Sequence, residues 1–125
     1  MSVVVGLRGV AELIVTTADT AVALGSGDVA VLATPRVVAL CEEASCRALD
    51  GHLDATTTTV GTRIELDHVR PTAVGARVGA EARLEEIDGR RLTFIVSAAD
   101  SAGVVATGRV IRVVVDRIAF IERLR

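Results

Sequence analysis

Hydrophobic and polar positions along this chain follow two different periods, one helical and one strictly alternating. Residues 32–49, LATPRVVALCEEASCRAL, are apolar around most of a helical circumference, which is typical of a buried helix. Pro35 suits the first turn of a helix, because its missing N–H needs no partner there, and Thr34 is the expected N-cap. The helix is expected to end near Asp50-Gly51, since glycine commonly follows a helix.

The period changes to two from Thr56 onward, and this alternation predicts β-strands with one buried face. Val60, Ile64 and Leu66 are expected to share the inward face of the strand that begins there. Asp88-Gly89 is a strong signal for a two-residue hairpin turn. The strands are expected over Ala11–Thr16, Thr56–Asp67, Ala76–Ile87, Arg90–Ala99 and Val104–Val115.

These elements predict a fold in which one helix covers one sheet. An antiparallel sheet with one apolar face needs a cover, and only one long helix is available to supply it. We therefore expect a single α+β domain over residues 1–125, with a curved antiparallel sheet of about five strands wrapped around one central helix, the hotdog fold. Its exposed sheet edges favour a homodimer or a higher homo-oligomer.

Composition and charge narrow the possible partners. All 14 basic residues are arginines scattered along the chain, the net charge is −2 and aromatic residues make up 2%, a pattern that argues against nucleic-acid binding. No apolar run approaches the roughly 20 residues of a membrane span. The N-terminal residues do not resemble a signal peptide, so we expect no membrane association and a cytoplasmic location.

The two cysteines give no sign of a disulfide or of a metal site. Cys41 and Cys46 are five residues apart on the expected helix and point in different directions, so both are expected to be small buried apolar side chains. No matching histidine pair provides the spacing of zinc ligands. We expect neither a metal nor another cofactor.

Candidate chemistry begins with Glu42 and Glu43, two adjacent carboxylates on the most apolar helix. Burying an ionised carboxylate costs several kcal/mol unless it is paired, yet the residues alone do not say which of the two faces inward. His68 continues the inward face of its strand and is either a core histidine or a general acid or base. Thr34 lies about 12 Å from Glu42 along a regular helix, so a shared site needs a spanning substrate, an intervening histidine or a second subunit.

Several motifs together resemble one family. They are T-P-R-V-V-A-L-C-E-E-A at 34–44, V-G-T-R at 60–63, H-V-R-P-T-A-V-G at 68–75 and E-E-I-D-G-R-R-L-T-F-I-V-S-A at 85–98. The chain resembles the hotdog thioesterases related to fluoroacetyl-CoA thioesterase, over nearly its whole length and with the spacing between motifs preserved. The resemblance implies a hotdog fold and hydrolysis of acyl-CoA thioesters.

The resemblance also assigns residues. It implies that Thr34, Glu42 and His68 are catalytic, which favours Glu42 over Glu43, and that the Gly61 N–H helps bind the thioester oxygen. Arg112 retains the arginine of the T-H-E-R motif that relatives carry in the final strand, and it is expected to bind substrate. Glu42 is expected to act either as a nucleophile or as the base for water.

One departure bears on specificity. The fluoroacetyl-specific enzyme has phenylalanines in the loop before the helix, whereas residues 23–30, ALGSGDVA, contain none. We therefore expect hydrolysis of a small acyl-CoA thioester without selectivity for fluoroacetyl-CoA. The alternative is a hotdog dimer that binds acyl-CoA without cleaving it. A hydratase is disfavoured because the D-x-N-x-x-H motif is missing, and a purely structural dimer leaves the inward Glu42 and His68 unexplained.

Overall fold

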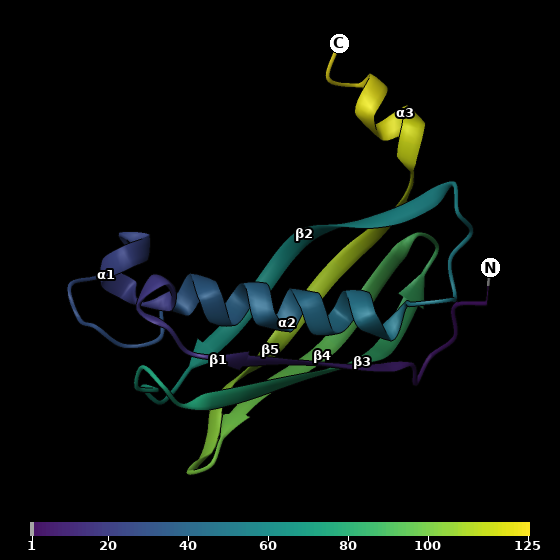
Figure 1. Cartoon of the computed structure of the whole chain (residues 1–125). Helices are drawn as coiled ribbons and strands as arrows, with labels where there is room; N and C mark the ends of the chain where they lie inside the picture. Colours follow the sequence, from purple (N-terminus) through teal and green to yellow (C-terminus); the bar gives the residue numbers. More distant parts are fainter. Residues whose placement is uncertain (1) are drawn as a thin grey trace.

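The computed structural model describes residues 2–125 and consists of one antiparallel sheet curled around one long helix (Figure 1). The strand order is β1-β3-β4-β5-β2, so β1 and β2 are the edge strands. The elements are β1 (Arg8–Ile14), η1 (Thr17–Asp19), α1 (Ala21–Leu24), α2 (Thr34–Ala48), β2 (Thr57–His68), β3 (Arg77–Asp88), β4 (Arg91–Asp100), β5 (Gly103–Asp116) and α3 (Arg117–Glu122).

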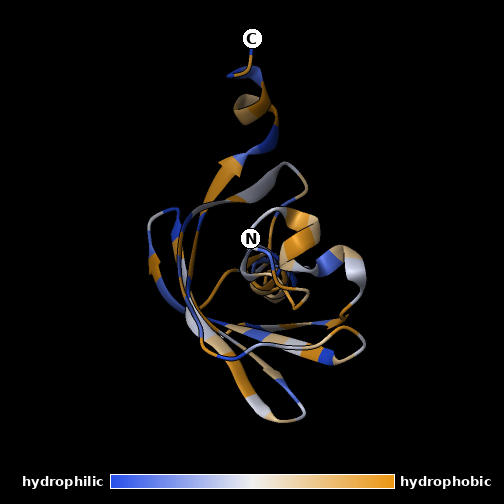
Figure 2. Ribbon diagram, turned by 90° about the vertical axis from the view of Figure 1, so that its left-hand side faces the viewer, coloured by the Kyte–Doolittle hydropathy of each residue, from blue (hydrophilic) through white to orange (hydrophobic). Residues whose placement is uncertain are grey.

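The predicted α+β hotdog architecture is confirmed. Viewed from the side, the sheet curves around α2 (Figure 2), and the buried apolar residues of the strands pack with those of α2 in one core. Val37, Leu40 and Ala44 of α2 are completely buried against the sheet. Gly9 of β1 lets the edge strand approach the helix closely, because a Cβ there would collide with the backbone of Ala44 and Ala48. None of the helices among the described residues is long and apolar enough to cross a membrane.

The beginning of α2 differs from the prediction. Ala33 is the N-cap residue and makes no side-chain capping bond, while Thr34 is already the first helical residue. The predicted N-cap role of Thr34 is therefore wrong, and its hydroxyl is available for another partner. Pro35 lies in the first turn as expected, since its missing N–H leaves no bond unmade there.

β2 contains an irregularity that reverses its alternation. Its register against β5 shifts between Gly61 and Arg63, the signature of a β-bulge. Beyond the bulge, Ile64 and Leu66 pack against the core as predicted. Before the bulge, the missing side chain of Gly61 faces α2, so Val60 belongs to the opposite face and its predicted inward position is wrong.

The two cysteines lie in different environments. Cys41 is buried in the core, where burial first and the neighbouring Glu42 charge second raise the pKa of its thiol to about 11. Cys46 is exposed, so the expectation that both are buried is wrong for this residue. Both are free thiols, as predicted.

Candidate active site

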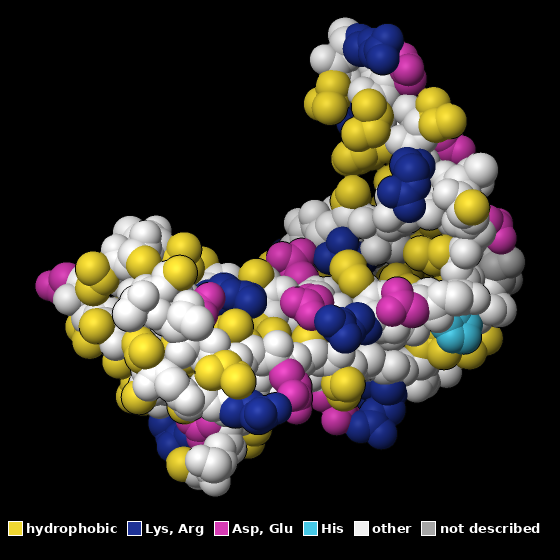
Figure 3. All heavy atoms as spheres, in the orientation of Figure 1, with side chains coloured by type: hydrophobic (Ala, Val, Ile, Leu, Met, Phe, Trp, Pro, Cys, Tyr) yellow, Lys and Arg dark blue, Asp and Glu magenta, His cyan; other side chains and the backbone are white. Residues whose placement is uncertain are grey.

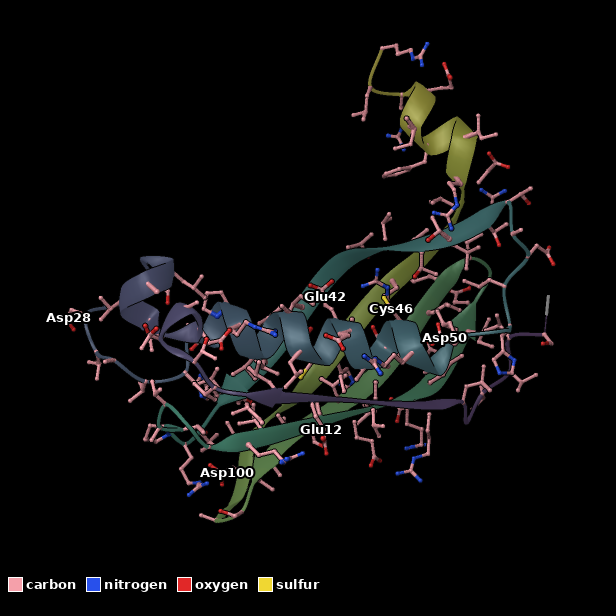
Figure 4. All side chains as sticks on the ribbon, viewed as in Figure 1. Glu12, Asp28, Glu42, Cys46, Asp50 and Asp100 are labelled. Carbon is pink, nitrogen blue, oxygen red and sulfur yellow. The ribbon has the colours of Figure 1, made fainter. Side chains whose placement is uncertain are left out.

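Glu42 lies in the middle of α2 and projects toward β2 and β5 (Figure 4). Its Oε2 accepts a hydrogen bond from Arg112 Nη1 at 3.0 Å. Arg112 comes from β5 and is only 7% exposed, yet each of its guanidinium nitrogens has a partner. Its Nε donates to Thr59 Oγ1 at 2.9 Å, and its Nη2 donates to the Thr59 carbonyl at 3.1 Å. The buried arginine thus fixes the position of the Glu42 carboxylate.

Gly61 provides the space for this carboxylate. It pairs with Arg112 across β2 and β5 and lies directly before the bulge. A Cβ at Gly61 would collide with Glu42 Oε2 and would lie 3.4 Å from Arg112 Nη1. Only a glycine therefore allows the carboxylate and the guanidinium to pack against the strand backbone without displacement.

Glu43, the adjacent carboxylate, faces away from this group. Its Oε2 accepts a hydrogen bond from Arg47 Nη2 at 2.8 Å, one turn further along the same helix. Its side chain is 42% exposed, and such a surface pair contributes well under ~1 kcal/mol. Both side chains are partly exposed, Glu42 at 34% and Glu43 at 42%, but Glu42 is directed at the buried Arg112 of the sheet and Glu43 at an arginine of its own helix, a distinction that the residues alone left open.

A second polar group forms where α2 begins and β2 ends. Thr34 Oγ1 lies 2.8 Å from His68 Nδ1, which joins the first helical residue to the last residue of the strand. His68 Nε2 is buried and has no hydrogen-bond partner among the described residues. Buried polar atoms are nearly always paired, so this nitrogen is a vacant donor or acceptor position. An imidazole with one nitrogen fixed and the other free is suited to proton transfer.

A cavity of about 360 Å³ opens beside Thr34 and His68. Apolar side chains from α1 and the loop before α2 line one wall, and residues 69–71 after β2 line another. Arg70 in this second wall forms an ion pair with Asp100, whose other oxygen accepts from Thr72 Oγ1 at 3.2 Å. The Asp100 pKa is lowered, first by the Ala102 backbone N–H and then by Thr72 and Arg70. This network fixes the segment that forms the wall.

The two polar groups are separate within one chain. Eight positions separate Thr34 from Glu42 on α2, a rise of about 12 Å. The structure therefore brings Thr34 to His68, and Glu42 to Gly61 and Arg112, without joining the two sets. Thr59 belongs to the Glu42 group and was not anticipated, because the bulge that turns it inward leaves no simple signal in the sequence. Among the described residues, no cluster of His, Cys, Asp or Glu could hold a metal ion.

Solved structures of similar proteins define the class to which this protein belongs. The structure aligns with a hypothetical protein from Thermus thermophilus, described as a thioesterase superfamily member, at 28% identity and a TM-score of 0.86, over 97% of this chain and 92% of that one. The fluoroacetyl-CoA thioesterase FlK aligns with a TM-score of 0.93 and 29% identity, over 100% of this chain and 97% of that one. The chain is thus a hotdog-fold member of the thioesterase superfamily.

The particular family follows from the sequence matches. The family described as fluoroacetyl-CoA-specific thioesterase matches residues 15–118. The fluoroacetyl-CoA thioesterase of Streptantibioticus cattleyicolor is 34% identical over 95 residues, which cover 76% of this chain and 68% of that protein. The chain belongs to this family of acyl-CoA thioesterases.

Proposed function

We propose that the protein hydrolyses small acyl-CoA thioesters without being selective for fluoroacetyl-CoA. The observation that carries the proposal is the Glu42 carboxylate, held by a buried arginine against a glycine of β2 in a chain of this family. If Glu42 and Arg112 served only to pack the core, their ion pair would bring no advantage. Replacing a buried ion pair by apolar side chains of similar volume commonly leaves a protein at least as stable.

In the proposed reaction, the Gly61 N–H stabilises the negative charge that develops on the thioester oxygen. As a general base, Glu42 takes a proton from a water molecule that attacks the carbonyl carbon. As a nucleophile, it attacks that carbon itself, and water then cleaves the resulting anhydride. In both routes the C–S bond breaks and His68 donates a proton to the departing thiolate, giving a carboxylic acid and CoA thiol.

Thr34 and Arg112 act on these groups rather than on the reacting bond. Thr34 holds the His68 ring through Nδ1, which directs Nε2 away from it. Arg112, for which sequence reasoning proposed a contact with substrate, has its donors directed at Glu42 and Thr59. We therefore assign Arg112 the role of positioning the Glu42 carboxylate.

A homodimer through β2 supplies the connection that one chain lacks. β2 is an edge strand whose outer backbone groups can pair with a second copy. Gly61 and His68 both lie on β2, and an antiparallel pairing centred between them sets the Gly61 of one chain opposite the His68 of the other. Glu42, which contacts Gly61, then approaches the partner's His68. Each active site takes Glu42 from one subunit and the Thr34–His68 pair from the other.

The substrate proposal rests on the cavity beside Thr34. Solved FlK structures include complexes with acetyl-CoA and with fluoroacetate and CoA. In the present chain, residues 23–30 contain no aromatic side chain, and Val29, Val31 and Leu32 contribute to the lining. Small aliphatic side chains provide a general apolar surface rather than a shape suited to one acyl group.

The test is thiol release from a panel of CoA esters, from acetyl and fluoroacetyl to medium-chain and phenylacetyl. Wild type is expected to turn over several small esters, and Glu42→Gln to lose about 10³-fold or more in kcat. The matched control is Glu43→Gln, because that carboxylate lies at the surface on the same helix. Binding of the esters by wild type without any thiol release would overturn the proposal in favour of a non-catalytic acyl-CoA-binding dimer.

A further inference from the structure

The C-terminal helix α3 projects from the body of the molecule (Figure 1) and exposes apolar side chains (Figure 3). Ile118 and Ile121 lie about one turn apart on α3 and are 71% and 51% exposed, and Leu124, in the turn that follows the helix, is 80% exposed. The helix has six residues, and isolated helices this short are not stable in water. These apolar side chains stay largely exposed in the part of the chain that the structure describes, residues 2–125, so they are free to pack on another surface.

The base of α3 is fixed to the start of β2. The Arg117 N–H donates to the Thr56 carbonyl at 2.9 Å, and Asp116 caps the helix by accepting from the Ala119 N–H at 2.8 Å. The direction in which α3 leaves the sheet is thus set by backbone and capping bonds. At the opposite end of β2, His68 and residues 69–71 line the cavity. α3 and the cavity therefore lie at opposite ends of the same edge strand.

Antiparallel pairing of β2 with a second copy brings these two ends together. In such a two-fold arrangement, the start of β2 in one chain lies beside the end of β2 in the other. α3 of one subunit then reaches the partner's α1 and the loop before its α2. The space-filling view shows an open notch above α2, between the α1 lobe and α3, that leaves room for this partner (Figure 3).

The surface at that end is complementary to α3. Val22 of α1 and Val29 of the following loop are exposed apolar side chains; Val29 lines the cavity, and Val22 follows the lining residue Ala21. The same loop carries the acidic Asp28 at its tip (Figure 4), while the segment that ends α3 carries two arginines, Arg123 and Arg125, of which Arg125 pairs with Glu122 at 3.7 Å. Apolar side chains thus meet apolar side chains, and acidic and basic groups come to the same region.

We propose that α3 of each subunit packs against α1 and residues 25–31 of the partner and covers the partner's acyl cavity. This inference rests on the β2-edge dimer of the proposed function. It assigns Ile118, Ile121 and Leu124 as the apolar cover of a cavity whose own loop has no aromatic side chain. The second subunit thereby contributes to the shape of the acyl site as well as to its chemistry.

Cysteine cross-linking tests this contact directly. In a Cys46→Ser background, Ile121→Cys is combined with Val22→Cys and oxidised with copper phenanthroline. The double variant is expected to give a covalent dimer on a denaturing, non-reducing gel, because α1 and α3 of one chain lie far apart (Figure 1). The matched control pairs Ile121→Cys with Val10→Cys, an exposed valine on the opposite edge strand, and is expected to stay monomeric on the gel.

Three other results of cross-linking and sedimentation would each contradict the proposed contact. No cross-link in a protein that sediments as a dimer would overturn the α3 contact and leave the proposed dimer and thioesterase standing. A monomer in sedimentation would overturn both the contact and the dimer. Equal cross-linking by the test and control pairs would overturn the contact, because it would show random collision.

A second measurement does not depend on disulfide geometry. Ile118→Asp with Ile121→Asp is expected to raise the dimer dissociation constant about tenfold or more, since two buried apolar contacts are lost. It is also expected to raise KM for longer acyl chains more than KM for acetyl-CoA. Val10→Asp, the control, is expected to change neither quantity. An unchanged dissociation constant and unchanged KM values in the α3 variant would contradict the proposal.

Discussion

The two polar groups of the site, Glu42 with Arg112 and Thr34 with His68, differ in how completely their hydrogen bonds are made. The Glu42 carboxylate is held by an arginine that is itself fully engaged with Thr59. The His68 ring has one fixed nitrogen and one buried nitrogen without a partner among the described residues. The arginine that holds Glu42 has a partner for each guanidinium nitrogen within the chain, whereas the buried His68 Nε2 can be paired only by a group from outside the described residues.

This difference separates two tasks that a hydrolase must perform. A charge near the reacting carbon must be held in place, since preorganised electrostatics contribute most when nothing has to move. A proton donor must exchange its proton with the substrate, so it needs a free position. The Glu42 group therefore combines stability with function, whereas the Thr34–His68 group contributes mainly to function. Substitutions in the two groups should separate these contributions.

Replacing His68 should lower activity strongly and change stability little. His68→Asn is expected to lower kcat about 10³-fold for CoA esters, with the free energy of unfolding changed by less than about 1 kcal/mol. Steady-state thiol release and urea denaturation measure the two quantities. An aryl thioester, whose leaving thiolate needs little protonation, should recover much of the loss. His52→Asn, which replaces the histidine that contacts Ser2, is the control. If His68→Asn lowered the free energy of unfolding by several kcal/mol, enough to explain the lost activity, His68 would be a core residue instead.

Replacing Arg112, in contrast, should have a large effect on stability. Arg112→Met leaves the partly buried Glu42 without its cation, and the free energy of unfolding is expected to fall by about 2–3 kcal/mol. This is less than for a fully buried pair, because the Glu42 side chain is 34% exposed. The double variant Arg112→Met with Glu42→Leu should regain much of the loss, since the unpaired charge is gone. Additive destabilisation in a double-mutant cycle would contradict the coupling.

Gly61→Ala should sharpen the comparison by moving the carboxylate without removing it. The new Cβ collides with Glu42 Oε2, and kcat/KM is expected to fall about 10²-fold as the carboxylate leaves its position. Gly79→Ala, in open space on β3, is the matched control and should be nearly silent. Equal activity of the two variants would show that Glu42 need not contact the β2 backbone.

The smallest expected effect concerns Asp100, which supports the cavity wall beside the Thr34–His68 group. Its pKa is lowered in the folded protein, so its contribution to stability is present above its ordinary pKa and is lost as the pH falls through the lowered value. Between pH 5 and pH 2, wild type should therefore lose more stability than Asp100→Asn does. Parallel pH profiles of the two proteins in urea denaturation would contradict this.

The sequence predicted the architecture well because two clear periodicities point to it. The buried helix, the alternating strands and a tight hairpin turn all follow from local pattern, although the two turn residues are Gly89 and Arg90, one position later than the predicted Asp88-Gly89. The β2 bulge does not, and it reverses which residues of that strand face the helix. Local patterns also missed α3, whose apolar side chains Ile118 and Ile121 stay exposed among the described residues.

The site was less accessible to sequence reasoning than the fold. The nearly uniform apolar surface of α2 left Glu42 and Glu43 equally placed, and only the resemblance to relatives favoured Glu42. The position of Arg112 beside Glu42 joins residues that are 70 positions apart, which no local pattern can report. Thr34 was assigned as a cap for a sound local reason, yet its hydroxyl bonds to His68 from a distant strand.

The most direct test of the account is subunit complementation. Glu42→Gln and His68→Asn chains, each inactive alone, are unfolded together in equal amounts and refolded so that they assort at random. A site built from Glu42 of one subunit and His68 of the other is restored once in each mixed dimer, so thiol release should recover to about a quarter of wild type. No recovery in a mixture that contains mixed dimers would contradict the shared site and place all catalytic residues in one chain.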